Sequence, residues 1–138
     1  MNHFRFGITA LSLMVLTVGC QKPTASKMPP LHPVEGTVTK DGKPIKEAFV
    51  QFVPDSGSEN VTINALTSAD GKFELMTLYV QGAVNEKKRG APEGAYTVSV
   101  TMPLDAQQRG GEQYQLPDKY QVKPGANEFP LELNPKKK

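Results

Sequence analysis

Apolar and polar residues alternate along much of this chain, and turn sequences interrupt the alternation. Residues 34–39 follow a strict two-residue period, as in a strand with one buried face. The pairs Asp41-Gly42 and Asp70-Gly71 are strong signals for tight hairpin turns. Outside the N-terminal segment, no stretch has the i, i+3, i+4, i+7 apolar spacing of an amphipathic helix. The pattern therefore predicts an all-β domain.

The composition agrees with short strands joined by many turns, since the chain has 12 Gly and 12 Pro among 138 residues. We expect about seven strands in two packed sheets, a β-sandwich. Strands are expected at residues 34–39, 48–52, 61–67, 73–75, 96–100 and 128–133. The expected core consists of Val34, Val38, Val50, Phe52, Ala65, Phe73, Leu75, Tyr96, Val98, Val100, Phe129 and Leu131.

The N-terminus has the layout of an export signal. Arg5 supplies a positive charge, and residues 6–18 form an uncharged apolar stretch that is too short to span a bilayer. Gly19 and Cys20 follow, and Cys20 is the single cysteine, so it has no disulfide partner within the chain. This arrangement resembles the bacterial lipobox. The resemblance implies cleavage between Gly19 and Cys20, lipid on the Cys20 sulfur and membrane attachment; the alternatives are an ordinary signal with an incidental cysteine or an uncleaved anchor.

The remaining chain divides by composition. Residues 20–33 hold the Cys and a Pro-rich stretch typical of an extended tether, residues 34–134 are the expected sandwich, and residues 135–138 are a basic tail. Gln21 after the Cys favours, by the same resemblance, the outer membrane over the inner one. The formal net charge of +2 predicts no nucleic-acid partner, which would require a concentrated basic face.

Three sequence blocks resemble carboxypeptidase-regulatory-like, transthyretin-like domains, in order along the chain. They are VEGTV, DGKPI and AFVQF at 34–52, TSADGKF at 67–73, and GAPEGAYTV at 90–98. Small bacterial lipoproteins with one such domain often end with two further segments, which resemble LPDKY at 116–120 and the strand that begins with GANEF at 125–129, so five blocks stand in order. The resemblance implies a prealbumin-like sandwich of Greek-key topology that acts as an accessory, folding or binding module.

Residues for catalysis are scarce. His3 lies in the signal and His32 in the tether, which leaves the expected sandwich without histidine and argues against a catalytic triad or a zinc site. Asp41 and Asp70 each precede Gly without the series of oxygen ligands that calcium requires, so we interpret them as turn residues. We therefore expect no enzyme activity, no metal and no cofactor.

Two long loops, at residues 81–93 and 103–118, are the candidate binding regions. The alternative is that they are solvated connections. The leading hypothesis is a membrane-anchored, non-catalytic module that binds or scaffolds another envelope component. A cell-surface carbohydrate-binding module and an accessory subunit of an envelope enzyme are the alternatives. The candidate binding residues are Lys87, Lys88, Arg89, Arg109 and Tyr114.

Overall fold

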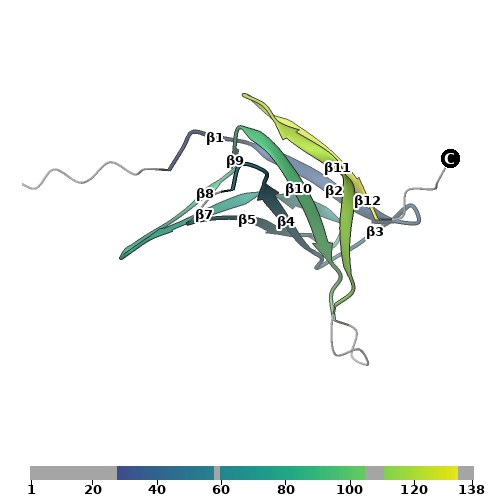
Figure 1. Ribbon diagram of the computed structural model, residues 1–138. Helices are drawn as coiled ribbons and strands as arrows, with labels where there is room; N and C mark the ends of the chain where they lie inside the picture. The colour runs from purple at the N-terminus through teal and green to yellow at the C-terminus, as the bar shows by residue number, and fades with distance from the viewer. Residues whose placement is uncertain (1–27, 58–59, 105–110, 134–138) are drawn as a thin grey trace, which may run out of the picture.

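The computed structural model describes residues 28–57, 60–104 and 111–133, and every regular element in these ranges is a strand (Figure 1). The lipidation and cleavage residues Gly19 and Cys20, the candidate Arg109 and the basic tail lie outside the described residues. Within the described part, no helix is long and apolar enough to cross a membrane.

The larger sheet has six strands, and each neighbouring pair is antiparallel. In spatial order the strands are β11 (Gln113–Val122), β10 (Gly94–Thr101), β4 (Phe49–Pro54), β5 (Val61–Leu66), β7 (Met76–Gln81) and β8 (Val84–Arg89).

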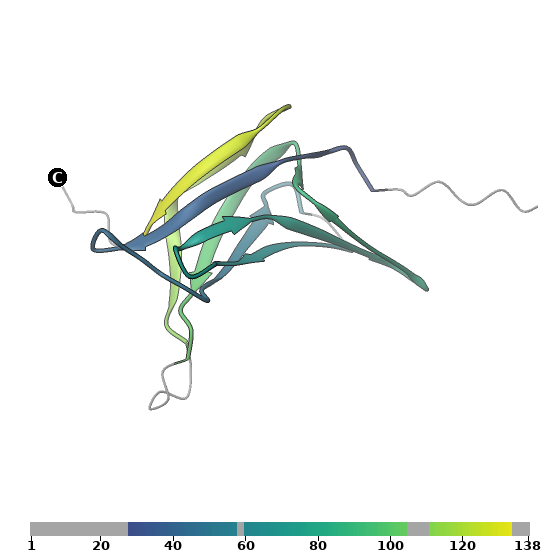
Figure 2. The same ribbon diagram turned by 180° about the vertical axis from the view of Figure 1, so that it is seen from behind.

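The smaller sheet packs across it, as the view from behind shows (Figure 2). Its central strand β2 (Val34–Lys40) pairs in parallel with β12 (Asn127–Glu132) and antiparallel with β3 (Lys43–Pro44) and β6 (Lys72–Glu74). A separate short pair joins β1 (Leu31–His32) to β9 (Ala91–Pro92). The predicted all-β sandwich is confirmed.

The core lies between the two sheets, where the inward residues of each alternating strand meet. All of the expected core residues are buried except Phe129, which is half-buried and packs against Phe52 with ring centroids 6.0 Å apart. The core also contains residues that were not expected there: Ala48, Ile63, Tyr79, Ala91, Leu116, Val122 and Leu133, with buried Thr67 and Thr77.

Both predicted loops contain strands in their described residues, so the bounds of those two predictions are wrong. Residues 81–93 contain the second half of the β7–β8 hairpin and β9, and residues 113–118 belong to β11. Charged VNEKKR can form β8 because β8 is the edge strand of its sheet, with most side chains in solvent.

The chain also changes sheets where one strand was expected at residues 73–75. β6 pairs with β2 and β7 pairs with β5, and the buried Leu75 between them donates its N–H to the Val34 carbonyl. His32, which was assigned to the tether, pairs with Ala91 in β1, so this histidine belongs to the folded domain. Its Nδ1 accepts a hydrogen bond from the Gly125 N–H at 3.3 Å.

Candidate functional site

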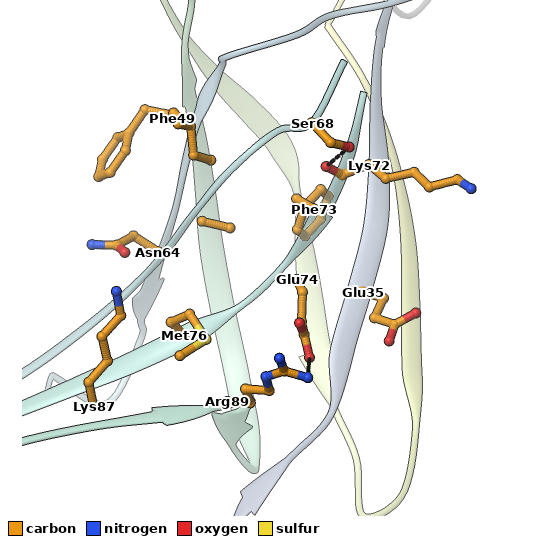
Figure 3. Close-up of a pocket in the computed structure, with 12 residues that line it drawn as sticks. Glu35, Phe49, Asn64, Ser68, Lys72, Phe73, Glu74, Met76, Lys87 and Arg89 are labelled. Atoms are coloured by element: carbon orange, nitrogen blue, oxygen red, sulfur yellow. Dashed lines mark hydrogen bonds and ion pairs between the residues drawn. The ribbon is translucent and has the colours of Figure 1, made fainter. Parts of the chain in front are cut away.

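A groove runs along the outer surface of β5, β6 and β7, where the chain passes between the sheets (Figure 3). We call it the crossover groove; its volume is about 640 Å³. Strand pairing assembles it from distant segments, because Leu66 lies opposite Phe49 and Met76 lies opposite both Asn64 and Arg89. The strand register therefore determines which residues lie together in the groove.

Apolar side chains form one part of the groove. Phe49 is 39% exposed and Leu66 is 63% exposed, and both stand on the outer face because their neighbours Val50 and Ala65 point into the core. Met76 adds a flexible thioether beside them. An apolar surface of this kind, bordered by charges, is typical of a site that binds another molecule.

Charged side chains of both signs surround these apolar residues. Arg89 forms an ion pair with Glu74 at 3.5 Å, and Lys72 forms one with Asp70 at 3.3 Å. Lys87 lines the groove and makes no ion pair with a described residue. Its ammonium group is therefore available to an acidic group of a ligand.

Glu35 lies on the opposite side of the groove from Lys87 (Figure 3). In the register of the smaller sheet it stands between Glu128 and Glu74. Lys72 lies on the same side as Glu35 in Figure 3, and the Glu74–Arg89 pair lies between that side and Lys87. Charges of both signs therefore border the groove, which favours a ligand that carries both.

The four candidate residues that the structure describes do not form one site. Lys87 and Arg89 line the crossover groove together, as expected for residues two apart on one face of β8. Lys88 points to the other face and pairs with Glu86 at 3.3 Å. Arg109 lies outside the described residues. Among the described candidates, only Lys87 and Arg89 therefore share a surface.

Tyr114 lies on the opposite edge strand, β11, and is half-buried. Its hydroxyl accepts a hydrogen bond from Lys40 Nζ at 2.5 Å, and the same ammonium lies 4.9 Å from the ring centroid. The hydrogen bond to Tyr114, aided by Glu112, raises the pKa of Lys40 above its ordinary value. Tyr114 therefore contributes to a local packing contact.

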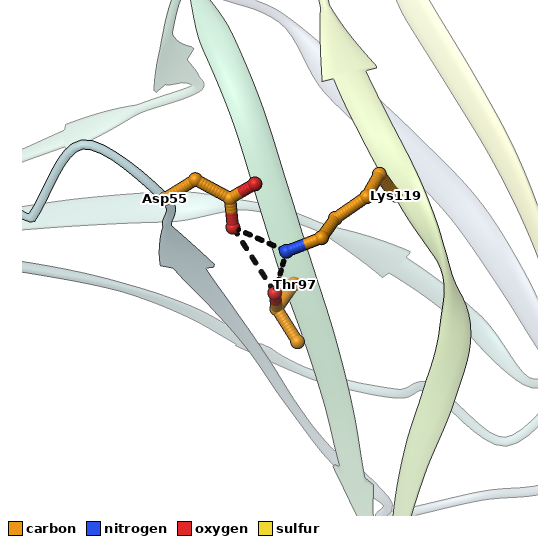
Figure 4. Close-up of polar contacts among 3 residues, drawn as sticks. All are labelled: Asp55, Thr97 and Lys119. Carbon is orange, nitrogen blue, oxygen red and sulfur yellow. Dashed lines mark hydrogen bonds and ion pairs between the residues drawn. The ribbon is translucent and has the colours of Figure 1, made fainter.

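A second polar cluster lies on the outer face of the larger sheet, at β4, β10 and β11 (Figure 4). Lys119 Nζ donates to Asp55 Oδ1 at 2.7 Å and to Thr97 Oγ1 at 2.8 Å, and Thr97 donates to the same carboxylate oxygen at 3.1 Å. The hydrogen bond from Lys119 is the main cause of the lowered pKa of Asp55. Because these three side chains form hydrogen bonds with one another, the cluster connects the end of β4 to β10 and β11.

No group of three His, Cys, Asp or Glu side chains in the described residues could hold a metal ion. Burial raises the pKa of Tyr96 to about 12, and its hydroxyl donates to the Pro92 carbonyl at 2.7 Å. The neutral phenol of Tyr96 thus serves a structural contact.

Sequence reasoning missed Phe49, Leu66 and Met76, the apolar part of the groove. Phe49 and Leu66 did carry a signal, because each is a large apolar residue at an outward position of an alternating strand. Such a residue has no role in the core of a sandwich and is therefore a candidate for contact with a partner.

Comparison with known protein families, with characterised proteins and with solved structures finds no match to this chain.

Proposed function

We propose that this chain is an exported lipoprotein, anchored through lipid on Cys20, whose sandwich is a non-catalytic binding module for another envelope protein. The crossover groove is the binding surface. The observation that carries this proposal is the combination of exposed Phe49 and Leu66 with the unpaired Lys87 in one groove. The carboxypeptidase-regulatory-like resemblance supports the same role.

The shape of the groove favours a segment of protein over a compact small molecule. Its lining residues come mainly from six strands, β2, β4, β5, β6, β7 and β8, and charged residues of both signs border the apolar surface. An extended peptide can place apolar side chains on Phe49 and Leu66 while its acidic side chains meet Lys87. If the partner is an enzyme, this chain is its accessory subunit.

A carbohydrate ligand has less support, because sugar binding normally uses exposed aromatic rings. Tyr79 is buried, and Tyr120 packs its ring 5.4 Å from the ring of Phe129. Of the aromatic side chains in the described ranges, Phe49 has the largest exposed fraction. One ring on one strand gives no platform for a sugar chain.

The anchor is tested by detergent-phase partitioning of the wild type and Cys20→Ala. We expect the wild type in the detergent phase and the variant in the aqueous phase, because acyl chains contribute about 0.8 kcal/mol per buried CH₂ group. Equal partitioning of the two proteins would show that Cys20 carries no anchor.

The groove is tested by crosslinking in the native envelope with a photoreactive residue in place of Leu66. We expect a specific crosslinked protein that is lost in Lys87→Glu, because the reversed charge repels an acidic ligand group. The matched control is Lys46→Glu, an exposed lysine outside the groove, which should keep the crosslink. An identical crosslink in both variants would contradict the proposed role of the groove.

A further inference from the structure

The β7–β8 hairpin extends beyond the rest of the larger sheet (Figure 1). Its two-residue turn consists of Gly82 and Ala83, and Gly82 adopts a left-handed φ of 59°. β8 places this turn roughly 17 Å beyond Arg89, at about 3.4 Å per residue. The tip is thus a narrow projection with solvent on both faces.

The tip of the hairpin is apolar, and charged residues follow it along β8. Val80 is 39% exposed and Val84 is 48% exposed, and Ala83 between them is also exposed. Further along β8, Lys88 is paired with Glu86 and Arg89 with Glu74, so the charges behind the tip are largely balanced. An apolar tip of this kind can enter the interface of a bilayer while the charged part of the strand stays in water.

The hairpin projects from the end of the domain at which the described chain begins. Both views show β1 and the hairpin at this end, away from β3 (Figures 1 and 2). β1 packs beside β8, and the Gly90 backbone closely approaches His32. The tip and the start of the described chain therefore share one end of the domain.

The length of the intervening chain is compatible with contact between the tip and the bilayer. Cys20 and Met28 are eight residues apart, and a chain of that length spans at most roughly 30 Å. β7 is paired with β5 as far as Tyr79, so the turn projects about 10 Å past that pairing, at about 3.4 Å per residue. A hairpin of this reach on the same side can enter the bilayer interface while the lipid on Cys20 is inserted.

We propose that the β7–β8 hairpin is a second membrane contact, in which Val80, Ala83 and Val84 enter the bilayer interface. This inference rests on the lipid anchor of the proposed function. The two contacts together orient the sandwich on the membrane and hold the crossover groove at a fixed angle to the surface.

The test uses the lipidated protein in vesicles of phosphatidylcholine with phosphatidylglycerol. Because lipid occupies the Cys20 thiol, Ala83→Cys introduces the one thiol open to a fluorescent label. Lys43→Cys, on β3 at the far end, is the matched probe position. We expect quenching of the label at position 83 by spin-labelled acyl chains, with protection from aqueous iodide, and the reverse at position 43.

Val84→Asp in the protein labelled at position 83 should abolish quenching by the acyl chains. Val53→Asp is its matched control, since Val53 is 47% exposed on β4 and lies away from the tip. Equal iodide access at positions 83 and 43, in protein that floats with the vesicles, would overturn the hairpin proposal and leave the anchor intact. Protein that does not float, with an unmodified Cys20 in the mass spectrum, would overturn both proposals.

Discussion

Thr67 holds the segment between β3 and β4 to the end of β5. It is 3% exposed, and its Oγ1 accepts from the Ala48 N–H at 2.8 Å and donates to the Ile45 carbonyl at 2.7 Å. Its backbone N–H donates to the Ala48 carbonyl. One hydroxyl therefore satisfies a donor and an acceptor that would otherwise be buried without partners.

Thr67→Val tests this contact, since valine keeps the shape and removes the hydroxyl. We expect the free energy of unfolding to fall by about 1–3 kcal/mol, because two backbone groups lose their partner. Thr67→Ser is the control, in which the hydroxyl stays and one methyl is lost. Urea denaturation measures both variants. A larger loss in the serine variant would show that methyl packing, and not hydrogen bonding, is the main contribution of Thr67.

Other residues in the family-like blocks also have structural roles. A Cβ on Gly36 would lie 2.1 Å from the Phe129 carbonyl oxygen and 2.6 Å from the Phe73 ring, so only glycine fits in VEGTV. The Asn127 side chain donates to the carbonyls of Lys123 and Gly125 and fixes the turn before β12. These blocks could predict a fold because they contain the residues that the fold requires. They contain little information about a ligand.

At the scale of the strands, alternation predicted β2, β4, β5, β10 and β12, whose inward residues are mainly apolar. It did not predict β7, because the inward residues of β7 are Thr77 and Tyr79 and the outward ones are apolar. β8 and β11 were not expected either, because they are the two edge strands of the larger sheet and are less constrained by burial. β11 also contains a bulge, where Leu116-Pro117-Asp118 interrupts the register between Thr97 and Ser99 of β10.

The sequence identified some residues of the crossover groove but not their neighbours in the sheet. Lys87 and Arg89 were candidates because they lie in a charged stretch, which a single sequence displays directly. Their proximity to Phe49 and Leu66 depends on the order β4-β5-β7-β8, which follows from long-range pairing. A sequence pattern indicates which face a side chain takes, but not which strand lies beside it.

The cluster of Asp55, Thr97 and Lys119 connects the end of β4 to β10 and β11, and its contribution to the stability of the fold should depend on pH. The pKa of Asp55 in the folded protein lies below its ordinary value of 3.8, chiefly because of the Lys119 hydrogen bond. A carboxylate with a lowered pKa stabilises the fold above its unfolded pKa, and this effect disappears as the pH falls through the folded pKa. The contribution is thus present at neutral pH and is lost below about pH 3.8.

Asp55→Asn should therefore be less stable than the wild type at neutral pH, and the difference should vanish in acid. Thermal unfolding across this pH range measures it. Lys119→Gln is the control, because it removes the main cause of the shift and should give the same flattened profile. A difference between wild type and Asp55→Asn that stays constant down to the lowest pH would contradict this account.

At the scale of the whole molecule, the sandwich is closed by strands from opposite ends of the described chain. β12 lies at an edge of the smaller sheet and pairs in parallel with β2. The Asn127 N–H donates to the Pro33 carbonyl and the Leu133 N–H to the Thr39 carbonyl, at the two ends of this pairing. Without β12, one edge of β2 would be unpaired and its apolar residues would be more exposed to solvent.

Removal of β12 should consequently unfold the whole domain and not just one edge. Leu131 and Leu133 are 1% and 4% exposed, and each contributes about 1.5–3 kcal/mol by burial. Domains of this size are stable by about 5–15 kcal/mol, so the loss of both leucines and of the pairing with β2 approaches the total. A chain that ends at Gly125 should therefore show no cooperative thermal transition by circular dichroism, whereas a chain that ends at Asn134 should unfold like the wild type. A cooperative transition at the wild-type temperature in the shorter chain would show that the six-stranded sheet is stable without this closure.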